Sequence, residues 1–148
     1  MSWKQLLDNR DVQRHQTSKQ ELDNIRKLII RDLADASITA LSADRRFATA
    51  YNAALQSAAM TVLCSGYRVS ARAGHHQITF EAAHLAIGSK AAALTDYFDA
   101  CRRKRNVIDY INSSVATETE SEELLNKAQE FHVLVEQWIA TKQPKFTP

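Results

Sequence analysis

A short basic stretch in the second half of the chain carries the residues whose types and spacing best suit phosphate chemistry. Arg102, Arg103, Lys104 and Arg105 are four consecutive cations, and Asn106 follows them directly. Four cations on about one helical turn repel one another unless a phosphate or a carboxylate lies near. The stretch therefore indicates an anion-binding surface, although a solvated helix face is the commoner reason for such a run.

Arg105 stands out because the helical spacing places it on an apolar face. The apolar residues Leu94, Phe98, Cys101 and Ile108 recur at the spacing of one helix face, and Arg105 falls among them. A guanidinium there needs hydrogen-bonding partners or a place at an interface or cleft mouth. The alternative is a snorkelling arginine with a buried stem and a hydrated head. The neighbouring Asn106 is a second candidate; the alternative interpretation is that it simply occupies an exposed position.

A polar segment between residues 66 and 77 supplies further candidates for binding RNA or phosphate. The candidates in this segment are Arg68, Arg72, His75 and His76, and Arg102 and Arg103 of the basic stretch complete the set. Adjacent histidines in an extended chain point to opposite sides, and no Cys, Asp or Glu lies at helical ligand spacing beside them. The sequence therefore predicts no metal site. It also contains no nucleophile elbow and no glycine-rich loop that would cradle a nucleotide, so we expect no cofactor.

The elements that must position these residues read as helices. The chain has 148 residues, of which 45% are hydrophobic and 24% charged, and it has only 3 Gly and 2 Pro. That balance is globular, and the shortage of turn residues disfavours β-hairpins. We predict a single all-α domain over 1–148, an antiparallel up-and-down bundle of four to five helices with its core at about 18–141.

Capping signals and apolar spacing set the predicted helix bounds. Ser18 and Glu21 form a capping-box pattern that opens a helix ending near residue 36, and Thr119 with Glu122 forms a second such pattern before the last helix. The other predicted helices run from about 42 or 44 to 63, from 79 to 87, and from 89 to a break at 112–115. Residues 2–14 predict one or two helical turns, and the segment 66–77 is predicted to be a loop.

The cysteines, the apolar runs and the net charge bear on the compartment and the partners expected for the protein. Cys64 and Cys101 lie in apolar helical stretches and suit reduced core residues, although a bridge between them stays open. No apolar run approaches the length of a membrane span, and the first 14 residues do not resemble a signal peptide. We therefore expect a cytoplasmic protein without membrane contact. The net charge of +2 implies no nucleic-acid partner by itself.

The stretch from Arg102 to Tyr110, late in a helix and followed by a capped final helix, resembles the HEPN superfamily of helical bundles. The polar loop that leads into a short helix is similar to a subgroup of small stand-alone HEPN proteins of bacteria and archaea. The resemblance covers roughly residues 18–141. It implies a homodimer in which the Arg-Asn helix lines a basic cleft between protomers. It further implies RNA as a ligand and a nucleotidyltransferase-like antitoxin as a partner, in a toxin–antitoxin or defence system.

The resemblance also implies a catalytic motif, from which this sequence departs. HEPN ribonucleases have an arginine followed, after four to six residues, by a histidine. Arg105 and Asn106 match the Arg-Asn of that motif, and Tyr110 stands where the histidine belongs. A second registration starts at Arg103 and places Ile108 at the histidine position. Tyrosine titrates near pH 10 and histidine near 6.5, so either registration impairs proton transfer at neutral pH.

Three functions follow as hypotheses. The first is a HEPN-like module, without an intact Arg…His motif, that binds RNA, a nucleotide or a partner protein. The second is an active metal-independent endoribonuclease toxin in which His75 or His76 supplies the missing imidazole. The third is a structural dimerisation domain in which Arg105 pairs with Asp109 or another carboxylate. The sequence favours the first of these, a non-catalytic or weakly catalytic binding module; any enzymatic activity would be that of a ribonuclease.

Overall fold

The computed structural model describes residues 1–110 and 114–148 of the chain, with the side chains of 109 and 110 excluded. In these parts the chain is mostly helical, as predicted, and forms six α-helices. They are α1 Trp3–Asp8, α2 Lys19–Ala36, α3 Ala43–Cys64, α4 His75–Ile87, α5 Ala92–Tyr110 and α6 Glu118–Lys142. Short 3-10 turns, Ser89–Ala91 and Pro144–Phe146, precede α5 and follow α6. None of the described helices is both long and apolar enough to cross a membrane.

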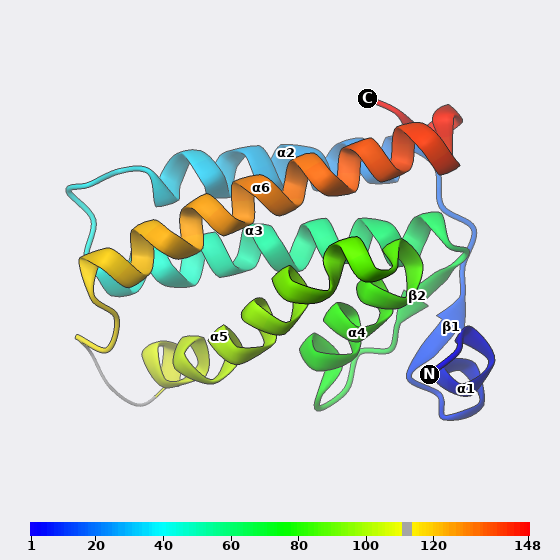
Figure 1. The fold of residues 1–148 in the computed structure, drawn as a ribbon, viewed down its shortest axis with the longest axis horizontal. Helices are drawn as coiled ribbons and strands as arrows, with labels where there is room; N and C mark the ends of the chain where they lie inside the picture. Colours follow the sequence, from blue (N-terminus) through cyan, green and yellow to red (C-terminus); the bar gives the residue numbers. More distant parts are fainter. Residues whose placement is uncertain (111–113) are drawn as a thin grey trace.

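Helix α3 is the centre of the fold. It packs against α2 and α6 on one side and against α4 and α5 on the other (Figure 1). Small residues make this possible, because Ala50, Ala53, Ala54 and Ala58 are fully buried and let neighbouring helices approach closely. Tyr51 is the largest fully buried side chain of this helix. Since α3 contacts every other long helix, its side chains reach both halves of the molecule.

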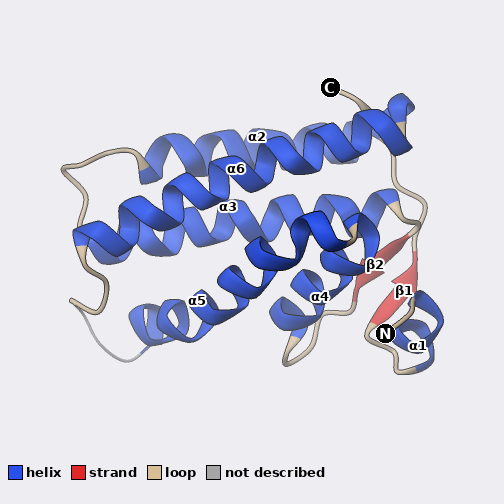
Figure 2. Ribbon diagram, in the orientation of Figure 1, coloured by secondary structure: helices blue, strands red, loops and turns tan. Residues whose placement is uncertain are grey.

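The sequence did not predict a small sheet. Strand β1, Val12–Arg14, pairs antiparallel with β2, Tyr67–Val69, beside α1 (Figure 2). Both strands are three residues long, and β2 lies inside the segment that we expected to be a loop. Strands this short carry almost no period-2 signal in the sequence. The sheet ties the N-terminal segment to the start of α4, and the stacked rings of Trp3 and Tyr67, 4.7 Å apart, support it.

Some helix ends lie where the sequence predicts them, and others differ from the prediction by a few residues. Ser18 caps α2, but only half of the expected box forms, because the Glu21 carboxylate accepts hydrogen bonds from Thr17 and His15. The box before α6 was predicted two residues late, since Thr117 and Glu120 form it. Helix α4 starts at His75 and not near residue 79, because Gly74 turns the chain with a φ of 82°. The predicted break at residue 112 lies outside the described residues.

Candidate functional site

Five of the predicted site residues line one pocket between α4 and α5. They are His75 and His76 from the first turn of α4, and Arg102, Arg105 and Asn106 from α5. Ala73 and Gly74 complete the lining of a cavity of about 220 Å³. No acidic side chain is among the described residues that line it. The pocket therefore joins two arginines, two imidazoles and an amide, a set of groups that suits an anionic ligand.

Helix α3 supports this pocket from beneath with two residues that the sequence interpretation missed. The Arg105 guanidinium lies 5.7 Å from the centre of the Tyr51 ring, and its Nη2 donates a 3.4 Å hydrogen bond to Oδ1 of Asn52. The cation–π contact favours the charged guanidinium at this depth. Tyr51 is fully buried, as expected of an aromatic residue on the core face of a helix. More than 50 residues separate it from Arg105, so the sequence gives no signal for the contact.

His76 belongs to the same cluster. Its Nδ1 lies 3.0 Å from the Tyr51 hydroxyl. Burial lowers the pKa of His76, and the nearby His75, Arg105 and Arg102 lower it further, to about 4. Burial also raises the pKa of Tyr51, so its hydroxyl keeps its proton. At neutral pH, His76 is therefore an uncharged imidazole that can exchange hydrogen bonds but carries no positive charge.

His75 has a defined tautomer. Its Nδ1 lies 2.8 Å from the carbonyl oxygen of Arg72, which can only accept, so the neutral ring donates from Nδ1 and leaves Nε2 without a hydrogen. The His75 ring stands nearly perpendicular to that of His76, at 87°, with the centroids 4.4 Å apart. We had expected this pair to point to opposite sides of an extended chain, which is wrong because both residues begin α4. The two histidines thus present different atoms to one pocket.

The other predicted binding residues lie elsewhere. Arg72 contacts the carboxylate of Asp11 and the carbonyl oxygen of Asn9, and Arg68 donates a 3.0 Å hydrogen bond to Gln13. Both arginines therefore connect the start of α4 to the N-terminal segment. Arg103 is exposed and is not part of the pocket lining. The side chain of Tyr110 lies outside the described residues, so its predicted role stays a prediction.

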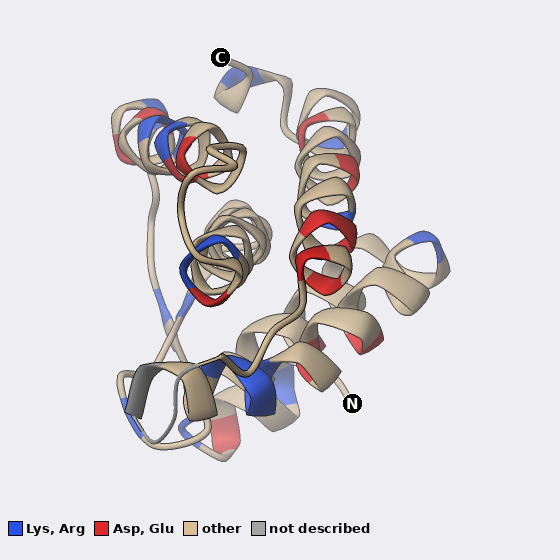
Figure 3. Cartoon of the chain, turned by 90° about the vertical axis from the view of Figure 1, so that its left-hand side faces the viewer, with Lys and Arg blue, Asp and Glu red and all other residues tan. Residues whose placement is uncertain are grey.

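Charge is distributed unevenly around the pocket. Figure 3 shows the basic stretch of α5 and, on another helix, the acidic turns at the start of α6. Two ion pairs keep part of the basic stretch in place, since Arg102 Nε lies 3.0 Å from Asp99 and Lys104 pairs with Glu120. Neither carboxylate belongs to the pocket lining. The positive groups that face the cavity are those of Arg102 and Arg105.

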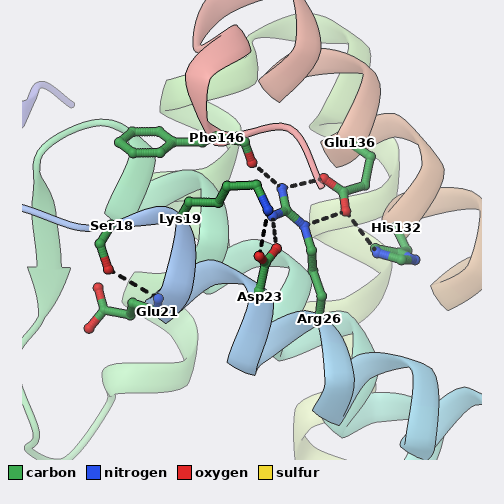
Figure 4. A network of polar contacts seen from close by, with 8 residues as sticks. All are labelled: Ser18, Lys19, Glu21, Asp23, Arg26, His132, Glu136 and Phe146. Atoms are coloured by element: carbon green, nitrogen blue, oxygen red, sulfur yellow. Dashed lines mark hydrogen bonds and ion pairs between the residues drawn. The ribbon is translucent and has the colours of Figure 1, made fainter.

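A buried arginine that the sequence interpretation also missed, Arg26, lies in a different setting from the half-buried Arg105. Arg26 of α2 is 5% exposed and donates to both carboxylate oxygens of Glu136, at 2.8 and 3.0 Å. It also donates to Asp23 at 2.8 Å and to the carbonyl oxygen of Phe146 at 2.6 Å (Figure 4). Burial alone would raise the pKa of Glu136, but the 3.5 Å contact with His132 and the hydrogen bonds from Arg26 lower it. This network joins α2, α6 and the C-terminal turn.

The described residues hold no group of three or more His, Cys, Asp or Glu side chains that could bind a metal ion. Cys64 is a free, buried thiol and Cys101 a free, half-buried one, and burial raises the pKa of both to about 11. Both cysteines are therefore protonated and unsuited to act as nucleophiles at neutral pH.

Comparison of the chain with known protein families, with curated proteins and with solved structures found no match.

Proposed function

We propose that this chain is a HEPN-like helical domain that binds single-stranded RNA, with a backbone phosphate in the α4–α5 pocket. The observation that carries the proposal is the convergence of Arg102, Arg105 and Asn106 with two imidazoles on one cavity, whose described lining residues include no acidic side chain. Arginine guanidinium groups bind phosphate oxygens through charge-assisted hydrogen bonds. The neutral His76 adds hydrogen-bonding capacity without adding a further charge that burial would penalise.

The position of Arg105 supports the same function. Asn52 and the Tyr51 ring hold the guanidinium at the pocket in advance, so little side-chain entropy is lost when a ligand binds. The pocket is small and fits one phosphate with parts of its nucleotide. This suits RNA whose bases are unpaired, because duplex RNA presents its phosphates on a wide, rigid surface.

Titration of a fluorescein-labelled single-stranded RNA with the purified protein, in EDTA, tests the proposal. Arg105→Ala should weaken binding about tenfold, which is the loss of one good phosphate contact. Arg103→Ala is the matched control, because it removes an equal charge from an exposed position of the same helix. Equal losses in both variants would show only general electrostatic attraction. Unchanged binding by folded Arg105→Ala protein would overturn the proposal.

Cleavage of the bound RNA is a second candidate function, favoured by the tautomer of His75. His75 lines the pocket, and its Nε2 lone pair can accept the proton of a ribose 2′-hydroxyl while the 2′-oxygen bonds to phosphorus and the 5′-oxygen leaves and takes a proton from water; Arg105 stabilises the charge on the phosphate. His76 suits that role less, because its pKa of about 4 makes it a weak base. In EDTA, wild-type cleavage that His75→Ala abolishes without loss of RNA retention would establish this function. RNA retained intact by the wild type would exclude it.

The HEPN resemblance adds two expectations about assembly. A homodimer would place two α4–α5 pockets near a shared cleft, and a nucleotidyltransferase-like antitoxin would cover that cleft. A purely structural dimerisation domain is the competing function, in which Arg105 serves stability alone. In that case Arg105→Ala would unfold the protein easily, and no RNA would bind to the wild type.

A further inference from the structure

An apolar pocket shares the lining residue His75 with the basic one. Its cavity of about 300 Å³ lies between α3, β2 and the first turns of α4. Ala59, Val62, Leu63 and Val69 give it apolar walls, and Gln56 and Arg68 stand at it as polar groups. His75 lines both this pocket and the basic one. An aliphatic hollow with a few polar groups and an imidazole suits a flat, mostly apolar ring with hydrogen-bonding edges.

Helix α3 connects the two pockets. Asn52, which accepts a hydrogen bond from Arg105, lies on the same helix face as Gln56, Ala59 and Leu63, since these residues are four, seven and eleven positions further along. At 1.5 Å of rise per residue, Gln56 lies about 6 Å and Ala59 about 10 Å beyond Asn52 along the helix axis. One extended nucleotide covers that span.

We propose that this apolar pocket is a nucleobase subsite, which takes the base of the nucleotide whose phosphate lies against Arg102 and Arg105. The inference rests on the proposed RNA function. It assigns a binding site to the base, which is the part of a nucleotide that contributes most of the affinity not due to charge. The fixed His75 ring offers a stacking surface, and the side chains of Ala59, Val62 and Leu63 remove the base from water. The Gln56 amide can donate and accept hydrogen bonds at base edges, and Arg68 can donate them.

A comparison of two labelled oligomers tests the subsite. Fluorescence anisotropy is measured with a seven-nucleotide oligoadenylate and with an abasic oligomer of equal length and charge. Wild-type protein should bind the oligoadenylate about tenfold more tightly, the gain expected from one buried, stacked base. Ala59→Trp fills the half-buried wall of the cavity and should abolish that difference while binding of the abasic oligomer persists.

The controls separate this inference from the function on which it rests. Gln56→Trp fills the same pocket from its half-buried neighbour on α3, should Ala59→Trp fail to fold. Arg105→Ala should weaken both oligomers by the same factor. Equal wild-type affinity for the two oligomers, or a difference that survives in a folded filling variant, would overturn the base subsite and leave the phosphate pocket standing. No binding of either oligomer would overturn both.

Discussion

Arg26 and Arg105 lie on faces of their helices that the apolar pattern assigns to the core, yet their surroundings differ. Arg26 donates to two carboxylates and a backbone carbonyl, all from the protein itself. Arg105 lies over an aromatic ring, beside an amide and two imidazoles, at the wall of a cavity that Arg102 also lines. The carboxylates make the first region electrically balanced, whereas the second collects positive charge around an opening.

The difference distinguishes two roles of an arginine on the apolar face of a helix. Charge pairs such as Arg26 with Glu136 fix the relative position of elements far apart in sequence, here α2, α6 and the C-terminal turn. A positive cavity instead favours an anion from outside, and none of the described residues that line this one is acidic. The first region should therefore respond to mutation through stability, and the second through ligand affinity.

The largest expected effect is on stability at Arg26. Arg26→Ala leaves Glu136 and the Phe146 carbonyl without their main donor, and it should lower the free energy of unfolding by about 3 kcal/mol. Urea denaturation followed by circular dichroism measures the change. RNA affinity of the protein that remains folded should stay within about twofold of wild type. A loss in the free energy of unfolding below about 1 kcal/mol would mean that the network contributes little to stability.

Arg105→Ala should show the opposite pattern. We expect a loss of about 1.4 kcal/mol in RNA binding, equivalent to tenfold, and a smaller loss in the free energy of unfolding. The slope of log affinity against log salt should also become shallower by about 0.7, because one phosphate contact disappears from a single strand. Salt titrations of wild type and variant give both quantities. A variant that unfolds readily but binds normally when folded would reverse the roles of the two arginines.

Proton binding sharpens the comparison at His76. Its pKa is about 4 in the fold, below the ordinary value of about 6.5 in an unfolded chain, so the unfolded state gains the proton first as pH falls. The stability that neutral His76 contributes is complete above about pH 6.5 and is lost as the pH falls toward 4. Free energies of unfolding measured from pH 7 to pH 4 should therefore decrease less in His76→Phe than in wild type. Parallel curves would contradict the burial of this imidazole.

The smallest effect should be that of Arg103→Ala. The residue is exposed on α5 and does not line the pocket, so its stability should change by less than about 0.5 kcal/mol. RNA affinity should fall by no more than about twofold, through loss of general attraction. A tenfold loss would show that the ligand also crosses the outer face of α5, which the pocket does not predict.

Much of the fold was predictable because apolar periodicity and caps are local signals. The positions of α2, α3 and α6 follow from stripes such as Leu22 to Leu33, and the helical composition excluded a large sheet. The sequence did not predict the pairing of β1 with β2, because each strand has three residues and the paired residues are more than 50 positions apart. Short elements gain their stability from tertiary contacts, which a local pattern does not contain.

The candidate site was predictable in part for the same reason. An arginine on an apolar face pointed to Arg105, and the same rule would have found Arg26, which follows Leu22 by four residues and precedes Ile29 by three. The partners Asn52 and Glu136 were beyond that rule, because they come from distant helices. Nothing in the spacing of Tyr51 sets it apart from a core aromatic residue. Its hydroxyl gains a role only when α4 brings His76 to it.

The most direct test compares the two regions in one sample by NMR of the histidine rings. Carbon–proton correlations of His75 and His76 report on the α4–α5 pocket, and those of His132, whose Nε2 lies 3.5 Å from Glu136, report on the Arg26 network. On titration with a short single-stranded RNA, the His75 and His76 signals should shift and saturate while that of His132 stays in place. Shifts at His132 alone, or at none of the three while the RNA is bound, would contradict a phosphate site in the α4–α5 pocket.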